Sequence, residues 1–143
     1  MGKRRSSREL GLRFLYQIEF NQDNFEAQIE PFLERCLCQP EVREFMVELV
    51  KGVHRHLKEI DALIQKYSEH WTLDRMTLID RNLLRLGVCE IIYLKNTPPK
   101  AAINEAVEIA KKYGSDESPD FINGILDKIY KEMPGSIARP SAS

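Results

Sequence analysis

The chain has 143 residues, of which 43% are hydrophobic and 30% are charged. This balance is typical of a folded globular protein, is too apolar for a disordered one, and suits one domain or two small lobes that share a core. No apolar run approaches the roughly 20 residues that span a bilayer, and none follows the basic N-terminus as in a secretory signal, so we expect a cytoplasmic protein without membrane contact.

Positive charge is concentrated at the start of the chain. The first thirteen residues have a net charge of +4, whereas the whole chain has a net charge of −1, so the remaining residues are acidic on balance. A distribution this uneven indicates a basic segment that binds a polyanion. The basic residues of this segment are Lys3, Arg4, Arg5, Arg8 and Arg13.

Apolar residues recur at helical spacing through almost the whole chain, and no stretch alternates as a strand does. We expect a first helix over residues 7–20 and a second over residues 25–37. Pro40 opens a third helix that continues to Ser68, about 40 Å long, with one apolar stripe along one side. Gly52 lowers its helix propensity by about 1 kcal/mol, and close approach of another helix is the expected compensation.

The second half of the chain is also helical in pattern. A turn over residues 71–76 precedes a helix over residues 77–94 that is apolar on nearly every side, which predicts a central position. The next helix begins at Pro98-Pro99 and ends before Gly114, a residue suited to the left-handed position after a helix. Ser118 and Pro119 match the N-cap and first position of a final helix that reaches about Met133.

These elements predict an all-α protein, a compact two-lobed helical bundle of about six to seven helices. We expect one domain over residues 1–133, with lobes of about 1–70 and 71–133. The small, polar segment 134–143 is expected to be a disordered tail.

No catalytic motif is present in the sequence, which contains neither a phosphate-binding loop nor a nucleophile or zinc-protease pattern. A metal site would need Cys36 and Cys38 to converge with His54 and His56, and reduced structural thiols are the favoured interpretation. Glu90 lies within the apolar central helix, where a structural ion pair with an arginine is favoured over a catalytic role. We therefore expect no enzyme activity, no cofactor and no metal.

The first helix has two contrasting faces on a helical wheel. The arc expected to face the core holds Leu10, Gly11, Phe14, Leu15 and Ile18, and the outward arc holds Arg5, Glu9, Leu12, Arg13, Tyr16 and Phe20. Arginines neutralise phosphates, and an exposed Tyr16 stacks on an unpaired base, which favours single-stranded RNA over a duplex. The alternative is a solvated basic tail, with Tyr16 packed against another helix.

Phe121 lies at the margin of the core stripe of the last helix, within its first turn. A half-exposed ring there would stand beside free backbone N–H groups, which attract phosphate. The nearby acids Asp116, Glu117 and Asp120 oppose such binding, although acids also stabilise a helix N-terminus. A plain core-edge position for Phe121 is equally open.

Three groups of segments occur in a characteristic order and spacing. They are Arg4-Arg5-Ser6-Ser7-Arg8-Glu9 with Leu15-Tyr16; Asp80-Arg81-Asn82-Leu83-Leu84-Arg85-Leu86 with Glu90; and Ala102-Ile103-Asn104-Glu105-Ala106-Val107-Glu108-Ile109-Ala110-Lys111 with Phe121-Ile122-Asn123-Gly124-Ile125-Leu126-Asp127. Together they resemble the NusB family of bacterial transcription antitermination factors, over nearly the whole chain from Arg4 to about Lys131.

The resemblance implies a two-lobed, all-helical fold that binds boxA RNA, a short element of nascent ribosomal and phage transcripts. It implies a protein partner, the small-subunit ribosomal protein NusE. It also implies action within an antitermination complex of RNA polymerase with NusA and NusG, with neither catalysis nor a cofactor.

The resemblance and the residues together define the candidate site. The RNA-binding candidates are Lys3, Arg4, Arg5, Arg8, Arg13, Tyr16 and Phe121, the partner-binding candidates are Tyr16 and Asp80, and Glu117 is the acid expected to tune RNA affinity. Ser6 and Ser7 interrupt what is often a longer basic run in the family. For Asn123 and Gly124, close helix packing and local hydrogen bonds are favoured over RNA contact. For Asn104 and Glu105, helix packing or partner contact is favoured over base recognition.

Two other functions remain open. The module also resembles the RNA-binding front domain of some ribosomal-RNA cytosine methyltransferases, which require a downstream nucleotide-binding fold and a catalytic cysteine that this sequence lacks. A helical scaffold that binds only protein is the third alternative, and it would show no RNA affinity.

Overall fold

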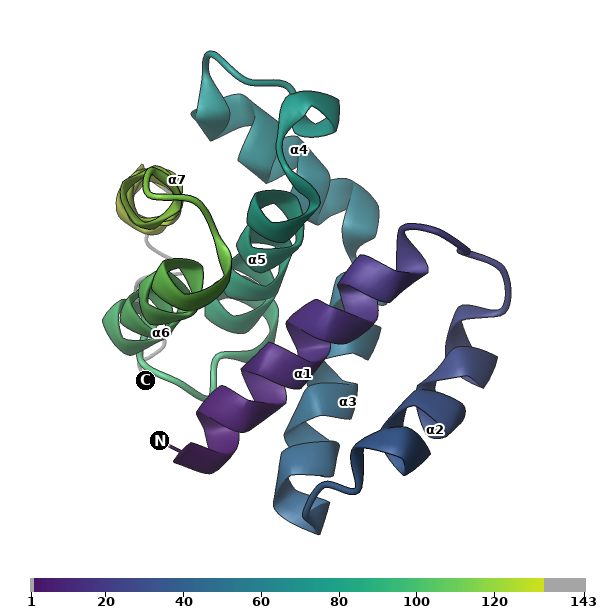
Figure 1. Cartoon of the computed structure of the whole chain (residues 1–143). Coiled ribbons are helices and arrows are strands. Elements are labelled where there is room, and N and C mark those ends of the chain that lie inside the picture. Colours follow the sequence, from purple (N-terminus) through teal and green to yellow (C-terminus); the bar gives the residue numbers. More distant parts are fainter. Residues whose placement is uncertain (1, 133–143) are drawn as a thin grey trace.

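The protein is represented by a computed structural model, in which residues 2–132 are described. Regular structure within this range is entirely helical (Figure 1), which confirms the all-α class. The elements are α1 (Gly2–Ile18), α2 (Phe25–Cys36), α3 (Pro40–Arg55), α4 (Leu57–Ser68), the 3-10 turn η1 (Leu73–Arg75), α5 (Leu78–Val88), the π-helical segment η2 (Cys89–Leu94), α6 (Pro99–Tyr113) and α7 (Ser118–Glu132). The expected helix end at Met133 and the expected tail over 134–143 lie outside the described residues.

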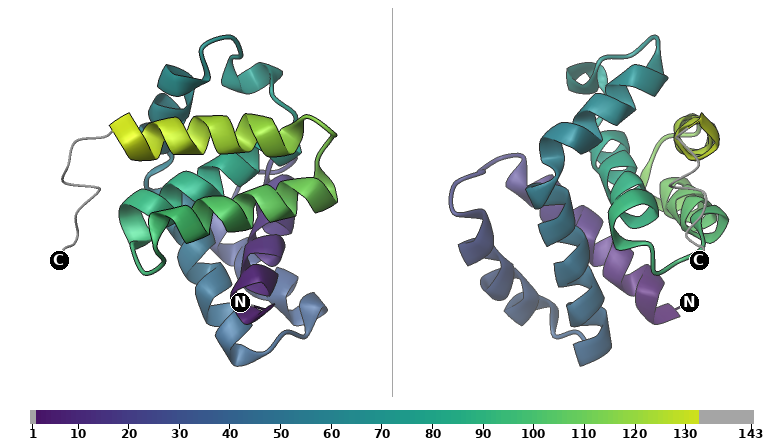
Figure 2. Two further views of the ribbon diagram at one scale, coloured as in Figure 1. Left: turned by 90° about the vertical axis from the view of Figure 1, so that its left-hand side faces the viewer. Right: turned by 180° about the vertical axis from the view of Figure 1, so that it is seen from behind.

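The helices form two packed groups that meet along α1. On one side of α1 lie α2 and α3, and on its other side lies α5 (Figure 1). The antiparallel pair α6 and α7 covers α5, as the left view of Figure 2 shows. Because α1 has neighbours on both sides, the basic N-terminal segment is part of a helix embedded in the fold, and it begins at Gly2 instead of the expected Ser7.

The expected long third helix is wrong, because the chain turns at His56 between α3 and α4. His56 has φ −111° and ψ 24°, and its ring stacks on Tyr93 with centroids 3.8 Å apart. After the turn, α4 packs against α5 and α7, so the second group of helices begins near residue 57, whereas the expected lobe boundary was near residue 70. The apolar spacing continues across this turn, which is why periodicity alone indicated one helix.

Two glycines are explained by close contacts. A Cβ atom added at Gly52 would lie 2.6 Å from Cys89 Sγ, which confirms the expected close approach of a neighbouring segment. Gly114 does not adopt the expected left-handed conformation, because its φ is −94° and its ψ is −169°. A Cβ there would lie 2.5 Å from Ser118 Oγ, so steric contact, not backbone conformation, accounts for this glycine.

The expected central helix is confirmed, although it consists of two segments. α5 begins where the Thr77 side chain accepts a hydrogen bond from the Asp80 N–H, and it continues into η2. Leu84 and Val88 are fully buried. Leu12 on α1 was expected to face outward but is 1% exposed, because α1 is enclosed on two sides instead of one.

Candidate nucleic-acid interface

The four arginines of α1 occupy different environments, and Arg8 is the most enclosed. Its side chain is 3% exposed, and its guanidinium pairs bidentately with Glu90, with Nε 2.9 Å from Oε1. The structural ion pair expected for Glu90 is thereby confirmed. The expected phosphate contact of Arg8 is not supported, because a guanidinium this enclosed cannot reach a phosphate without leaving Glu90.

Arg5 lies one turn earlier and is half-exposed. It donates two hydrogen bonds to Glu105 on α6, at 2.8 Å from Nε and 3.0 Å from Nη2. These bonds lower the pKa of the Glu105 carboxyl against the opposing effect of burial, and the charges of Arg5 and Arg8 act in the same direction. Arg5 therefore combines a fixed guanidinium with access to solvent.

Lys3 and Arg4 have weaker partners at the beginning of α1. Lys3 pairs with Glu41 at 3.6 Å, and both side chains are exposed. Arg4 lies over the ring of Phe45, 4.2 Å from its centroid, and donates to Thr97 Oγ1 at 3.1 Å. Since exposed ion pairs contribute little to stability, Lys3 can turn toward an incoming polyanion at small cost.

Arg13 and Tyr16 lie on the exposed side of α1, as expected. Arg13 forms no ion pair with any of the residues 2–132, and Tyr16 is 42% exposed. The ring of Tyr16 meets that of Phe20 edge-on, with centroids 5.5 Å apart. Beside them is a hollow of about 410 Å³, whose lining includes Leu12, Arg13, Tyr16, Gln17, Phe32, Ile79 and Tyr113.

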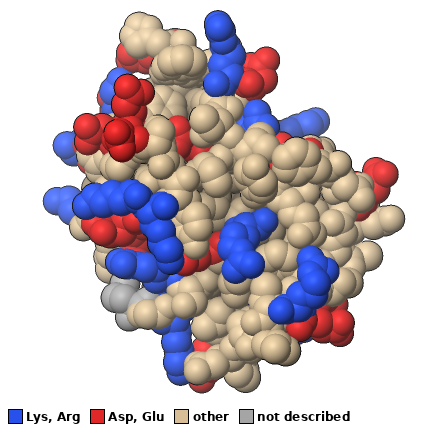
Figure 3. Space-filling view, viewed as in Figure 1, with Lys and Arg blue, Asp and Glu red and all other residues tan. Residues whose placement is uncertain are grey.

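The end of α6 adds residues that the sequence interpretation missed. Glu9 accepts hydrogen bonds from Lys112 Nζ at 3.1 Å and from the Tyr113 hydroxyl at 2.9 Å. Lys111 and Lys112 are exposed and extend the positive surface of α1 onto α6; in Figure 3, Lys and Arg side chains gather over this part of the molecule. The sequence showed these lysines only as a favourable helix end, and their proximity to α1 depends on the fold.

Asp80 is 9% exposed and faces the interior. Its carboxylate accepts a hydrogen bond from Ser118 Oγ at 2.7 Å, which joins the beginnings of α5 and α7. Asp80 Oδ1 is therefore occupied within the fold, and the partner contact expected for Asp80 stays a prediction. Glu117 is exposed and Phe121 is half-buried at the edge of the core, between the two alternatives considered for it.

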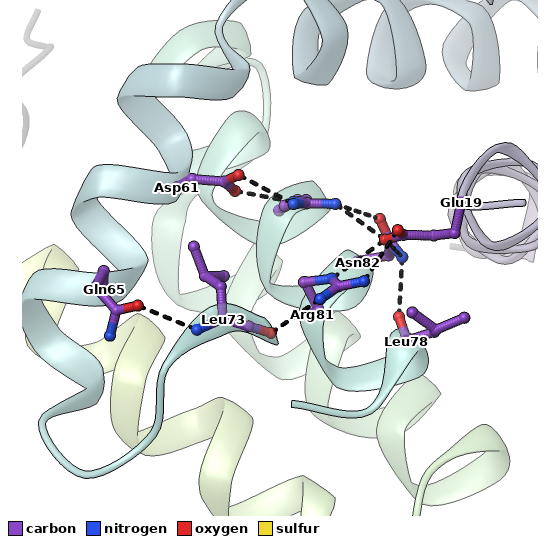
Figure 4. A network of polar contacts seen from close by, with 8 residues as sticks. Glu19, Asp61, Gln65, Leu73, Leu78, Arg81 and Asn82 are labelled. Carbon is purple, nitrogen blue, oxygen red and sulfur yellow. Dashed lines mark hydrogen bonds and ion pairs between the residues drawn. The ribbon is translucent and has the colours of Figure 1, made fainter. Parts of the chain in front are cut away.

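The rest of the Asp80–Leu86 segment forms an ionic network that links three helices (Figure 4). Glu19, just after α1, accepts bonds from Arg81 at 2.9 Å, Asn82 at 2.8 Å and Arg85 at 3.1 Å. Arg85 also pairs with Asp61 of α4 at 2.8 Å. Burial alone would raise the pKa of Glu19, but hydrogen bonds from Asn82 and Arg81 and the charges of both arginines outweigh it and lower the pKa. This network stabilises the fold.

The polar residues of the late segments have mixed environments. Glu105 is 7% exposed and pairs with arginines, whereas Asn104 and Asn123 are exposed. A Cβ at Gly124 would meet no atom within 4 Å, so the expected close helix packing at this glycine is wrong. Within residues 2–132, no cluster of three or more His, Cys, Asp or Glu side chains could hold a metal ion, and no helix has the length and apolarity to cross a membrane.

Known proteins resemble the chain over almost its full length. The NusB family model matches residues 5–131. The transcription antitermination protein NusB of Desulfosudis oleivorans is 43% identical over 141 residues, with 96% of this chain and 92% of that protein covered. NusB of Thermodesulfovibrio yellowstonii is 45% identical over 140 residues, with 91% and 93% covered.

Solved structures agree with this assignment. The structure of T. maritima NusB has a TM-score of 0.82 and 38% identity, with 94% of this chain and 96% of that chain covered. A structure of antitermination factors NusB and NusE in complex with dsRNA has a TM-score of 0.82 and 32% identity, with 93% and 99% covered. The family model, the relatives and the solved structures lead to one conclusion: the chain belongs to the NusB family.

Proposed function

We propose that the chain is a transcription antitermination factor that binds boxA RNA together with NusE and supports processive transcription of ribosomal RNA operons. The observation that carries the proposal is the exposed cationic and aromatic face of α1 in a member of the NusB family. We propose that it is a binding protein and not an enzyme. RNA polymerase, NusA and NusG are its proposed further partners.

The proposed RNA surface begins at the first turns of α1 and continues to the end of α6. Lys3, Arg4, Arg5 and Arg13 supply cations on one rigid helix, and Lys112 adds another from α6. Each cation that neutralises a phosphate releases condensed counterions, which makes binding favourable and dependent on salt. Arg8 contributes indirectly, because its buried pair with Glu90 fixes the part of α1 that carries the others.

We propose an unpaired strand as the RNA. Tyr16 and Phe20 present exposed rings, and base stacking on such a ring is worth roughly 1–3 kcal/mol. Bases in a duplex are already stacked, so they gain little from these rings. Phe121 and Glu117 border the proposed path at the beginning of α7, where the ring offers a further stacking edge and the acid reduces affinity.

NusE is proposed to dock at the hollow beside Tyr16. Tyr16, Phe32, Ile79 and Tyr113 provide apolar lining from four different helices or their boundaries. Aromatic anchors in a partly enclosed hollow are typical of protein interfaces. Asp80 is proposed to support this surface by holding the beginnings of α5 and α7 together through Ser118.

A titration with RNA tests the proposal. A single-stranded boxA-like RNA and a duplex of the same length are titrated into the protein, with and without NusE, at two salt concentrations. We expect tighter binding of the single strand, an increase in affinity with NusE, and weaker binding at the higher salt concentration. No RNA affinity in any arm would favour the protein-only scaffold, and preference for the duplex would contradict the role of the exposed rings.

A further inference from the structure

Glu105 lies between two arginines and forms hydrogen bonds with only one of them. Its two oxygens accept bonds from Arg5 at 2.8 and 3.0 Å, whereas Arg8 Nη1 is 3.6 Å from Oε1. The longer separation is an ionic contact but too long for a hydrogen bond. The Glu105 carboxylate is therefore hydrogen-bonded to a half-exposed arginine, Arg5, and is only in ionic contact with a buried arginine, Arg8.

The environment of Arg8 Nη1 is unusual. Among residues 2–132, Arg8 Nη1 is the only buried side-chain nitrogen or oxygen without a hydrogen-bond partner. Arg8 directs Nε and Nη2 to Glu90, so its remaining nitrogen has Glu105 as its nearest carboxylate. A buried N–H group without a partner is energetically unfavourable, more so on a charged group, and a structure that supplies a partner is stabilised.

Glu105 and a phosphate compete for the same donors of Arg5. Both donors that face Glu105 belong to the fork that binds a phosphate bidentately, and the Arg5 side chain is 41% exposed. If Arg5 turns to a phosphate, the buried Glu105 carboxylate loses both of its hydrogen bonds. Movement of its oxygen by less than an ångström would then complete a bond to Arg8 Nη1.

We propose that Glu105 is a positioning residue for RNA binding, which exchanges partners from Arg5 to Arg8 when Arg5 engages a phosphate. The exchange offsets the loss of the Arg5–Glu105 pair, because the carboxylate and the unsatisfied guanidinium nitrogen satisfy each other. In the absence of RNA, the same carboxylate holds Arg5 in place at the surface. This inference rests on the proposed RNA-binding function.

A static arrangement is the competing model. In that case Arg5 keeps both bonds to Glu105 and offers only Nη1 to the phosphate, so the hydrogen bonding of Arg8 does not change. The two models differ in one observable property, the hydrogen bonding of Arg8 Nη1, which guanidinium NMR of arginine-labelled protein measures without any reference to RNA affinity.

The first experiment uses the free protein. In Arg5→Ala, Glu105 has no surface partner, so we expect a downfield shift of the Arg8 Nη1 protons and slower rotation about the Cζ–Nη1 bond. Arg13→Ala is the matched control, because it removes an α1 arginine that pairs with no described carboxylate, and it should leave the Arg8 signals unchanged. Unchanged Arg8 signals in Arg5→Ala would overturn the exchange.

The second experiment adds the boxA-like single strand to the full-length protein. We expect the RNA-bound wild type to show the same direction of Arg8 shift as free Arg5→Ala, and Glu105→Gln to show a much reduced shift on RNA binding. RNA that binds tightly without moving the Arg8 signals would refute the exchange and leave the proposed function intact. Absence of RNA binding would refute the function, while the free-protein result would still decide whether Glu105 can change partners.

Discussion

Four arginines of one helix show how much the surroundings decide about a residue. Arg8 is buried in an ion pair, Arg5 is held at the surface by Glu105, Arg4 lies over an aromatic ring, and Arg13 is exposed. Residue type alone suggests the same role for all of them. Their partners, contributed by α3, η2, α6 and the segment between η2 and α6, separate a stabilising cation from cations available to RNA.

Arg13 provides the clearest test of a phosphate contact. Arg13→Ala should weaken RNA binding several-fold and reduce the slope of log affinity against log salt by about 1, because one counterion-releasing contact is lost. Fluorescence titrations at several salt concentrations measure both quantities. Lys58→Ala removes an exposed cation of α4 and is the control; an equal loss in this variant would indicate a general charge effect.

Replacement of Arg8 should affect the stability of the protein, whereas replacement of Arg13 should affect RNA binding. Arg8→Ala leaves Glu90, which is 2% exposed, as an unpaired buried charge, so we expect the free energy of unfolding to fall by about 3–5 kcal/mol. Urea denaturation measures the change. The double variant Arg8→Met/Glu90→Leu should recover most of the stability, because an apolar pair removes the uncompensated charge. A stable Arg8→Ala protein would contradict the structural role.

Glu117 is exposed near the beginning of α7 and forms no ion pair with the described residues. Glu117→Gln should increase RNA affinity a few-fold without a change in melting temperature, since it removes a repulsive charge from the proposed path. Glu59→Gln, an exposed acid on α4, serves as the control. A decrease in affinity for Glu117→Gln would instead indicate a favourable contact of this acid with RNA.

At the scale of elements, Glu19 joins the end of α1 to α4 and α5 through Arg81, Asn82 and Arg85. The lowered pKa of Glu19 means that its charged form is favoured by folding. Its contribution to stability is therefore present above the ordinary value of 4.5 and is lost as the pH falls through the lowered pKa.

This linkage gives a prediction for Glu19→Gln. The variant should lose on the order of 2 kcal/mol of unfolding free energy at pH 7, because several hydrogen bonds to a charged acceptor are weakened. The difference from wild type should shrink as the pH falls from about 4.5, where the carboxyl of the unfolded chain takes up a proton, to the lowered pKa of the folded protein. Urea denaturation between pH 3 and pH 7 measures it, and a difference that is independent of pH would contradict the assignment.

At the scale of the whole molecule, α1 is the element that both groups of helices share. Its buried Arg8 draws Glu90 from η2 and Glu105 from α6, so the first group of helices is incomplete without the second. We therefore expect a fragment of residues 1–56, which ends before α4, to lack a cooperative unfolding transition by circular dichroism and urea denaturation. A cooperative transition in this fragment would show that the first group of helices is independently stable.

Helical periodicity predicted most elements, because apolar spacing reports which residues are buried within a helix. It missed the turn at His56, since the apolar stripe continues across it, and the burial of Leu12, since spacing does not count the neighbours of a helix. The Arg13 and Tyr16 surface could be predicted from one helical wheel. The contribution of Lys112 and the enclosure of Arg8 could not, because both depend on residues about 80 to 100 positions away.

The amino-acid sequence by itself determined the all-helical class, the concentration of positive charge at the N-terminus and the resemblance to the NusB family. These properties depend on composition, local spacing and order along the chain. Only the tertiary structure decided which cations are free. The packing of η2 and α6 against α1 brings Glu90 to Arg8 and Glu105 to Arg5, and it brings Lys112 of α6 to Glu9 on α1. Electrostatic interactions act over a few ångströms in space, whatever the distance along the chain.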